Sequence, residues 1–240
     1  MSTVLMTGAT SGIGLELFNK YVEQGYDVIA CGRNQEKLTE LEPKAKATMR
    51  FDVNEPEQIK SAIQSFEGNI DIAILNAGDC RYIDDVVNFD GQLFADVINT
   101  NLTSMGFLLQ NILPKLSANG QLVLVSSSAT ILPFSRAQAY GASKAGLDYL
   151  ANSLRIDLAP KNISVSLVHP GFIKTPLTDR NDFPMPFIIS SEEAAIRIYK
   201  GVSARKPYIH FPKRLTLLLK LIAWLPDIIW HKIATKGLSK

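Results

Sequence analysis

Thr7-Gly-Ala-Thr-Ser-Gly12-Ile-Gly14 is the stretch that decides the fold of this 240-residue chain. It follows Val4-Leu-Met6, a short apolar run that predicts a buried strand, and a helical pattern of apolar residues follows it through position 22. A turn between a strand and a helix presents backbone N–H groups to an anion, and glycines let a phosphate approach that backbone. The stretch therefore predicts a dinucleotide-binding turn, and the alternative is a plain strand–helix connection.

Apolar runs and helical patterns alternate along the rest of the chain. We expect strands at 4–6, 28–31, 48–51, 70–75, 121–126 and 164–168, with 208–211 as a candidate seventh. We expect helices at 12–24, 35–41, 56–67, 91–113, 138–158 and 191–204. Continuous apolar strands that alternate with helices form a parallel sheet with helices on both faces. The expected fold is α/β, one doubly wound Rossmann-type domain over residues 1–240.

Bulk composition argues against several other classes of protein. The 25 basic and 23 acidic residues are too balanced to favour nucleic-acid binding. Cys31 and Cys80 have no metal-ligand spacing, so we expect no metal site and a reduced, cytoplasmic setting. A strand that begins at Thr3 leaves no room for a signal peptide. The uncharged stretch 116–135 is too polar to span a membrane.

Tyr140 and Lys144, four residues apart on an expected helix, form the most informative pair of side chains. Residues i and i+4 share one helix face, so the ammonium can lie close to the phenol. A nearby positive charge lowers a tyrosine pKa that starts at about 10. Such a tyrosine can exchange a proton with a carbonyl or alcohol oxygen near neutral pH. A surface Tyr–Lys pair without chemistry is the common alternative.

Four motifs together resemble the short-chain dehydrogenase/reductase family: the T-G-x-x-x-G-x-G turn, Asn76-Ala-Gly78, Tyr140-Gly-Ala-Ser-Lys144 and Pro170-Gly171. They occur in the family's order, and the resemblance runs from about residue 3 to residue 176. The glycine spacing and the length match its single-domain branch. The resemblance implies the strand order 3-2-1-4-5-6-7, and we expect a homodimer or homotetramer.

The resemblance implies a catalytic set of Asn101, Ser127, Tyr140 and Lys144. The family's usual gap of thirteen residues to the tyrosine selects Ser127, while Ser126 and Ser128 remain alternatives. Asn101 matches the helix asparagine that anchors a water leading from the lysine to solvent.

The end of the second expected strand bears on the choice of cofactor. NAD-preferring Rossmann proteins carry an acidic residue there, about 20 positions past the glycines. This chain has Gly32 at that place, and Arg33, whose guanidinium can bind a 2′-phosphate, follows it. Ser11 stands where the family often has a further basic residue. We therefore expect NADP(H), with NAD(H) as an alternative, although Arg33 could also be a solvated surface residue.

The resemblance implies that the other cofactor contacts come from the ends of the first, third, fourth and sixth expected strands and from the helix that carries Tyr140 and Lys144. Asp52 and Val53 would meet the adenine, the Ile173 backbone the nicotinamide amide, and Thr175 the pyrophosphate. The full implied set is Gly8, Thr10, Ser11, Gly12, Ile13, Gly14, Arg33, Asp52, Val53, Asn76, Ala77, Gly78, Tyr140, Lys144, Pro170, Gly171, Ile173 and Thr175. Cys80 and His169 lie close to these ends but have no partner by spacing, and we assign them no role.

Two apolar segments lie outside the shared motifs. Residues 177–190 are expected to form a substrate lid, and 213–240 an amphipathic helical extension with Lys213, Thr216 and Lys220 on one face. The apolar part of the extension is too short to span a bilayer. It could pack over the substrate mouth, form a dimer interface, or make peripheral contact with a membrane. We favour the first two, with the lid and residues 215–225 packed against each other or across a dimer axis.

The expected activity is NADP(H)-dependent transfer of a hydride between nicotinamide and the carbonyl or secondary alcohol of an apolar small molecule. One alternative is a non-catalytic NADP(H)-sensing protein, because a fold does not establish a function. The intact Ser–Tyr–Lys set argues against that alternative. The other alternative is a membrane-associated reductase of lipid carbonyls.

Overall fold

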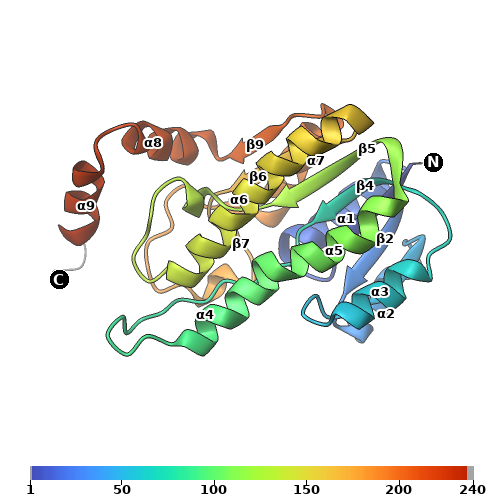
Figure 1. Ribbon diagram of the computed structural model, residues 1–240, viewed down its shortest axis with the longest axis horizontal. Helices are drawn as coiled ribbons and strands as arrows, with labels where there is room; N and C mark the ends of the chain where they lie inside the picture. The colour runs from blue at the N-terminus through green and yellow to red at the C-terminus, as the bar shows by residue number, and fades with distance from the viewer. Residues whose placement is uncertain (1, 237–240) are drawn as a thin grey trace.

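A seven-stranded parallel sheet forms the centre of the computed structural model, which describes residues 2–236. Its order is β3-β2-β1-β4-β5-β6-β9, which confirms the predicted topology with 208–211 as the seventh strand (Figure 1). The strands are β1 (Thr3–Thr7), β2 (Asp27–Gly32), β3 (Ala47–Arg50), β4 (Ile70–Leu75), β5 (Leu116–Val125), β6 (Ser164–Pro170) and β9 (Tyr208–Phe211). β5 begins five residues before the expected start, and the register of its pairing with β4 shifts between Ile70 and Ile72.

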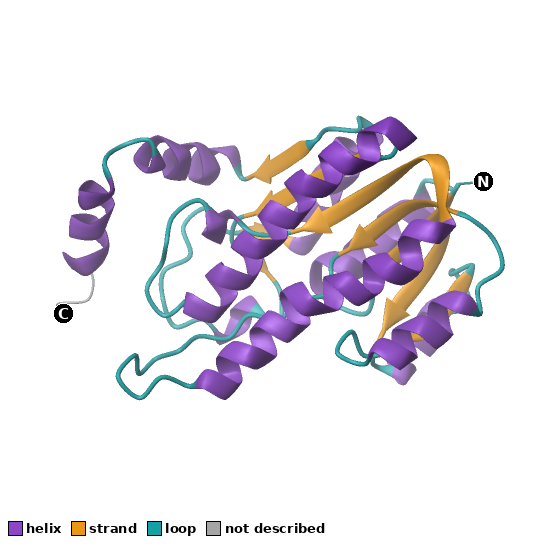
Figure 2. Ribbon diagram, viewed as in Figure 1, coloured by secondary structure: helices purple, strands orange, loops and turns teal. Residues whose placement is uncertain are grey.

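Helices cover both faces of this sheet, as predicted (Figure 2). One face packs against α3 (Pro56–Gln64), α5 (Ser104–Ile112) and α6 (Gln138–Leu158). The other packs against α1 (Gly12–Glu23), α2 (Gln35–Leu41) and α7 (Ser191–Ser203).

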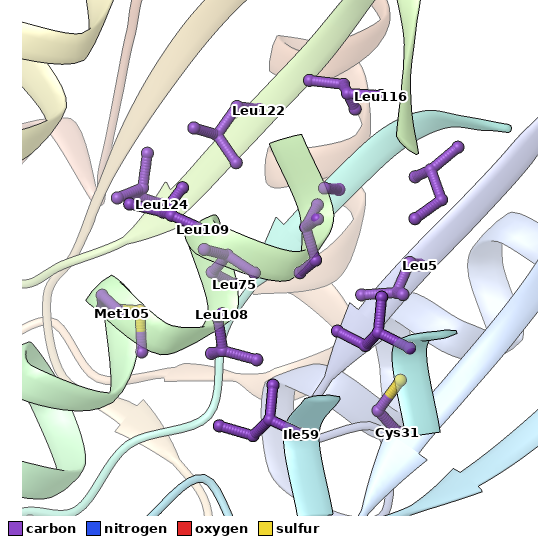
Figure 3. Close-up of a cluster of buried hydrophobic side chains, with 14 of the residues drawn as sticks. Leu5, Cys31, Ile59, Leu75, Met105, Leu108, Leu109, Leu116, Leu122 and Leu124 are labelled. Atoms are coloured by element: carbon purple, nitrogen blue, oxygen red, sulfur yellow. The ribbon is translucent and has the colours of Figure 1, made fainter. Parts of the chain in front are cut away.

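Alternation along the strands divides the core into two clusters. In β1, the side chain of Leu5 belongs to one cluster, whereas Val4 and Met6 belong to the other. Figure 3 shows Leu5 in the first cluster with Met105 and Leu108 of α5. Complete burial of one such side chain stabilises the fold by about 1.5–3 kcal/mol. These clusters fix the sheet rigidly, so the loops at the carboxyl ends of its strands hold a defined geometry.

The segment predicted as one helix over 91–113 contains a wider turn in its middle. α4 (Gly91–Ile98) passes into a π-helical turn, Asn99–Thr103, before α5 begins at Ser104. Such turns are rare and are frequent at functional sites. This one carries Asn101, whose side chain is completely buried.

A second, two-stranded sheet holds the two ends of the expected lid together. β7 (Ile173–Lys174) pairs with β8 (Ile189–Ser190) in parallel, with Ile173 opposite Ile189. The residues between these strands therefore form a loop whose ends are joined at the rim of the main sheet.

Two helices follow the last strand. α8 (Lys213–Ala223) and α9 (Asp227–Lys236) extend beyond β9 at one end of the molecule (Figure 1). Within residues 2–236, each helix is too short or too polar to cross a membrane.

Candidate active site

A cavity of about 620 Å³ opens at the carboxyl ends of the strands. It brings the glycine turn, Arg33, the end of β4, the start of α6 and the loop after β6 to one place. Its lining includes these predicted residues: Gly8, Ser11, Gly12, Ile13, Arg33, Asn76, Ala77, Gly78, Ser127, Tyr140, Lys144, Pro170, Gly171, Ile173 and Thr175. Thr10, Gly14, Asp52, Val53 and Asn101, which were also predicted, lie outside that lining.

The glycine turn has the geometry of an anion cradle. Gly8 and Gly12 have φ angles of +68° and +51°, a region that favours glycine. A Cβ at Gly14 would lie 2.0 Å from the carbonyl oxygen of Gly8, so the turn needs a bare backbone there. Ser11 precedes the helix, but its side chain makes no capping hydrogen bond. The start of α1 therefore faces the cavity with its backbone, and a pyrophosphate group fits this arrangement.

Lys144 lies on α6, one turn after Tyr140, and is almost completely buried. Its Nζ donates a hydrogen bond to the carbonyl oxygen of Val125 at 2.9 Å and lies 5.9 Å from the centroid of the Tyr140 ring. Burial lowers the pKa of Lys144 to about 8, although the charges of Cys80 and Asp148 oppose this shift.

The predicted direction of the Tyr140 pKa is wrong. Burial raises the pKa of this phenol above its usual value of 10, interaction with Cys80 raises it further, and a hydrogen bond with Ser127 lowers it only in part. Helical spacing does bring Lys144 close to the ring, but the ammonium is bonded to Val125 instead of the hydroxyl. Tyr140 is therefore a protonated phenol at neutral pH, the form that can donate a proton.

The three candidate serines are separated by their contacts. Ser127 interacts with Tyr140 through its side chain, and its Oγ also accepts a hydrogen bond from the Ala129 N–H at 3.1 Å. Ser126 Oγ donates to the backbone carbonyl of Lys144 at 3.3 Å. Ser128 is buried and does not line the cavity. Ser127 is thus the serine that the structure places beside the tyrosine.

Asn101 joins the end of β4 to α6. Its Oδ1 accepts from the Asp79 N–H at 2.8 Å, and its Nδ2 donates to the Asp79 carbonyl at 2.8 Å and to Ser143 Oγ at 2.9 Å. A Cβ added at Gly78 would lie 3.0 Å from Asn101 Oδ1 and 3.4 Å from Lys144 Nζ. Asn101 therefore fixes the wall of the cavity next to Lys144, and its predicted role as a water anchor stays a prediction.

Arg33 lies at the rim of the cavity, with 73 % of its side chain exposed. Its Nη1 lies 3.3 Å from Oδ2 of Asp52, so two residues predicted to meet the adenosine half of a cofactor are adjacent. Val53 lines a neighbouring cavity of about 520 Å³ together with Arg33. A Cβ at Gly32 would lie 2.8 Å from Thr10 Cγ2, so an acidic residue there would also have to displace Thr10.

Two polar groups near the site were missed by sequence reasoning. Arg81 lines both cavities and pairs with Asp79 at 2.7 Å and Asp96 at 3.3 Å. The other is His169, for which the sequence indicated neither a partner nor a role. A basic residue three positions after Asn76-Ala-Gly78 was the available signal for Arg81.

His169 has two partners, although its spacing suggested none. Its Nε2 lies 2.9 Å from Oδ1 of Asp148 on α6, and its Nδ1 lies 2.8 Å from the Tyr208 hydroxyl on β9. Only the sheet topology brings these residues together, because they are 21 and 39 positions away. A buried imidazole requires such partners, but spacing alone does not identify them.

Aromatic contacts and ion pairs hold the lid over the cavity. Phe183 makes edge contacts with Tyr82 at 5.5 Å and Phe172 at 6.1 Å between ring centroids. Arg136, just before α6, pairs with Asp182 at 2.7 Å and also with Asp84.

The lid and α8 have one partner in common. Phe172 packs against Leu215 and Leu219 of α8, and its ring also contacts that of Phe183 in the lid. Phe187 of the lid and Leu218 of α8 remain 45 % and 48 % exposed. The expected direct packing between lid and helix, within one chain or across a dimer axis, stays a prediction.

A model of the family described as short chain dehydrogenase matches residues 2–183, about three quarters of the chain. The chain belongs to the short-chain dehydrogenase family. This short-chain dehydrogenase is 30% identical to an uncharacterized oxidoreductase of Myxococcus xanthus over 98% of its own length and 96% of that protein. It is also 30% identical to a probable NADP-dependent dehydrogenase of Haemophilus influenzae, over 86% and 83% of the two chains.

Solved structures of low sequence identity share the fold of this short-chain dehydrogenase. A short-chain dehydrogenase of Burkholderia cenocepacia in complex with NADP superposes with a TM-score of 0.86 at 23% identity, covering 97% of each chain. The closed form of a serine dehydrogenase with NADP+ has a TM-score of 0.78 at 24% identity, covering 87% and 94%.

Proposed function

We propose that this short-chain dehydrogenase interconverts an apolar carbonyl compound and its secondary alcohol with NADP(H) as the cofactor. The observation that carries the proposal is that Ser127, Tyr140 and Lys144 line the same cavity as the glycine turn and Arg33. Proton-handling groups and a phosphate cradle thus share one space, as oxidoreduction by a dinucleotide requires.

The cavity offers separate groups for the parts of the cofactor. The bare backbone from Gly8 to Gly14 would hold the pyrophosphate, and Arg33 would bind a 2′-phosphate. Thr175, whose side chain lies next to Gly12, would sit near the pyrophosphate, and the backbone of Ile173, which also lines the cavity, would meet the nicotinamide amide. The relatives named for NADP support this choice over NAD(H).

The protein's part of the reaction is proton transfer and alignment. The bound cofactor supplies or accepts the hydride. During reduction, Tyr140 donates its phenolic proton to the carbonyl oxygen, and the Ser127 hydroxyl donates a hydrogen bond to the same oxygen. Lys144 keeps a positive charge one helical turn away, because its pKa of about 8 leaves it largely protonated at neutral pH.

The proposed apolar substrate is supported by the apolar side chains of the lid. Leu177 lines the cavity, and Phe183, also in the lid, makes ring contacts with Tyr82 and Phe172. Apolar area that a substrate removes from water at such side chains contributes favourable free energy.

The test separates binding from turnover. NADPH and NADH are titrated against the full chain by fluorescence, and cofactor consumption is then followed over a panel of ketones and aldehydes. We expect tighter binding of NADPH and turnover that favours apolar ketones. Binding of NADPH without turnover of any carbonyl would favour the sensing alternative, and an absence of dinucleotide binding would contradict the proposal.

A further inference from the structure

α8 turns Leu215, Thr216 and Leu219 toward the protein, and Lys213 and Lys220 also reach β9. Lys213 Nζ lies 2.8 Å from His210 Nε2, and Thr216, completely buried, lies 2.7 Å from His210 Nδ1. Lys220 places its ammonium 4.2 Å from the centroid of the Tyr208 ring. Three polar side chains of the helix are thus engaged with β9.

The opposite face of α8 consists mainly of large apolar side chains in contact with solvent. Leu217, Leu221 and Trp224 are 56 %, 61 % and 88 % exposed and recur at helical spacing. Exposed apolar side chains continue along the chain into α9, and we call the set the α8–α9 face; it comprises Leu217, Leu218, Leu221, Trp224, Leu225, Ile228 and Ile233. A large exposed apolar area marks a site of interaction with a protein or a membrane.

Among the described residues, 2–236, the side chains of the α8–α9 face remain exposed. The two helices lie beyond β9, the edge strand of the sheet (Figure 1). Leu215 and Leu219, on the other side of α8, anchor the helix to Leu132, and Trp230 Nε1 donates to the Pro133 carbonyl at 2.7 Å. The helices are therefore held in place while their apolar side chains point away.

Charge decides which partner fits this face. Residues 213–236 carry five Lys or Arg and a single acidic residue, Asp227. Lys213 and Lys220 are engaged with β9, which leaves Arg214, Lys232 and Lys236 for a partner. Arg214 is exposed on the same side of α8 as Leu217 and Leu221. In a two-fold dimer the same patch meets itself, so these cations would face one another. An anionic surface would pair with them instead.

We propose that the α8–α9 face binds the surface of an anionic lipid bilayer. The two helices lie in the plane of the interface, with Trp224 and the leucines among the upper acyl chains and the basic residues at the headgroups. Because α8 also packs on Gly171, which lines the cavity, the bilayer lies near the active site. The proposal does not rest on the proposed reaction, since membrane binding is measured without substrate or cofactor.

Co-sedimentation of the full chain with vesicles tests the proposal. The vesicles contain phosphatidylcholine alone or with about 30 % phosphatidylserine, a fraction chosen to give an anionic surface like that of a cytoplasmic leaflet. We expect binding to the anionic vesicles, weaker binding to the neutral ones, and loss of binding as salt is raised.

Two variants and a matched control identify the residues involved. The triple variant Leu217→Ser, Leu221→Ser, Trp224→Ser should weaken binding to anionic vesicles on the order of 100-fold. Arg214→Gln with Lys232→Gln should weaken it about fivefold per charge, through an effect that high salt removes. Ile156→Ser removes a side chain that is 74 % exposed on α6 and should change nothing.

Three results would overturn the proposal. One is equal binding to neutral and anionic vesicles, and another is unchanged binding by the triple variant. The third is a combination of two observations: the wild-type protein does not bind vesicles, and it sediments as a dimer that the triple variant converts to monomers. In that case the α8–α9 face would join two copies of the chain. The double variant Arg214→Gln, Lys232→Gln changes exposed side chains alone, so its vesicle binding tests the proposal even if the triple variant folds poorly.

Discussion

Gly14→Ala tests the close approach of the glycine turn to the first helix. A Cβ at this position would lie 2.0 Å from the Gly8 carbonyl oxygen and 2.7 Å from Asn76 Nδ2. An ordinary van der Waals contact begins near 3.4 Å, so the turn must move by more than an ångström. Overpacking of a core by a methyl group costs about 1–3 kcal/mol, and backbone cannot rearrange as a side chain can.

Gly106→Ala is the matched control for this change. Gly106 lies inside α5, and a Cβ there would meet nothing within 4 Å. Both substitutions gain about 1 kcal/mol of helix propensity, so their difference isolates the clash. We expect the free energy of unfolding in urea to be lower by at least about 2 kcal/mol in Gly14→Ala than in Gly106→Ala.

Cofactor binding should follow the same order. A displaced turn misplaces the backbone that would hold the pyrophosphate, and each 1.4 kcal/mol of lost binding free energy lowers affinity about tenfold. NADPH affinity should therefore fall at least about tenfold in Gly14→Ala and stay unchanged in Gly106→Ala. Equal unfolding curves and equal affinities for the two variants would refute this account of the turn.

Three further predictions concern the cofactor, the extension and pH. Arg33→Ala should weaken the binding of NADPH about 10–100-fold and leave the binding of NADH unchanged, whereas Lys60→Ala on α3 should change neither affinity. Equal losses of affinity for both dinucleotides in Arg33→Ala would exclude a contact with the 2′-phosphate. Leu219→Ala should lower the free energy of unfolding by about 2–4 kcal/mol and Leu218→Ala by less than about 0.5, because Leu219 is 7 % exposed and Leu218 is 48 % exposed; equal losses would contradict the orientation of α8. Burial lowers the pKa of His210 to about 4, below its unfolded value of about 6.5. The unfolded chain therefore binds the proton first, and the free energy of unfolding falls as pH drops from about 6.5 to about 4. A His210→Gln variant that loses stability just as steeply in this pH range would contradict the assignment.

The arrangement of the sheet could be predicted from the sequence because its determinants are local. The glycines before α1 and the continuous apolar runs specify strand, turn and helix one after another, and parallel strands joined by helices leave few topologies. The same reasoning places Tyr140 and Lys144 on one face of one helix. These elements depend on residues close together in the chain.

Other features depend on contacts between distant residues, and local patterns do not reveal them. The upward direction of the Tyr140 pKa is set by burial and by interaction with Cys80. The π-helical turn holds Asn101, which bonds to Asp79 and Ser143, and an apolar pattern looks alike with or without such a turn.

The orientation of the extension could not be read from its pattern. The pattern of Lys213, Thr216 and Lys220 correctly predicted a polar stripe, but a hydrophobic pattern cannot say which side faces the protein. In the structure, His210 and Tyr208 on β9 offer partners to these three polar residues. The apolar residues divide, with Leu215 and Leu219 buried and Leu217 and Leu221 exposed.

Turnover by Tyr140→Phe tests the central claim most directly. The substitution removes only the hydroxyl that would donate the proton, and Tyr149→Phe, on the same helix but 80 % exposed, is the matched control. Ketone reduction with NADPH should fall about 10²–10⁴-fold in Tyr140→Phe, with NADPH affinity retained and with Tyr149→Phe as active as the wild-type protein. A Tyr140→Phe variant that binds NADPH and keeps most of its ketone reductase activity would contradict the account.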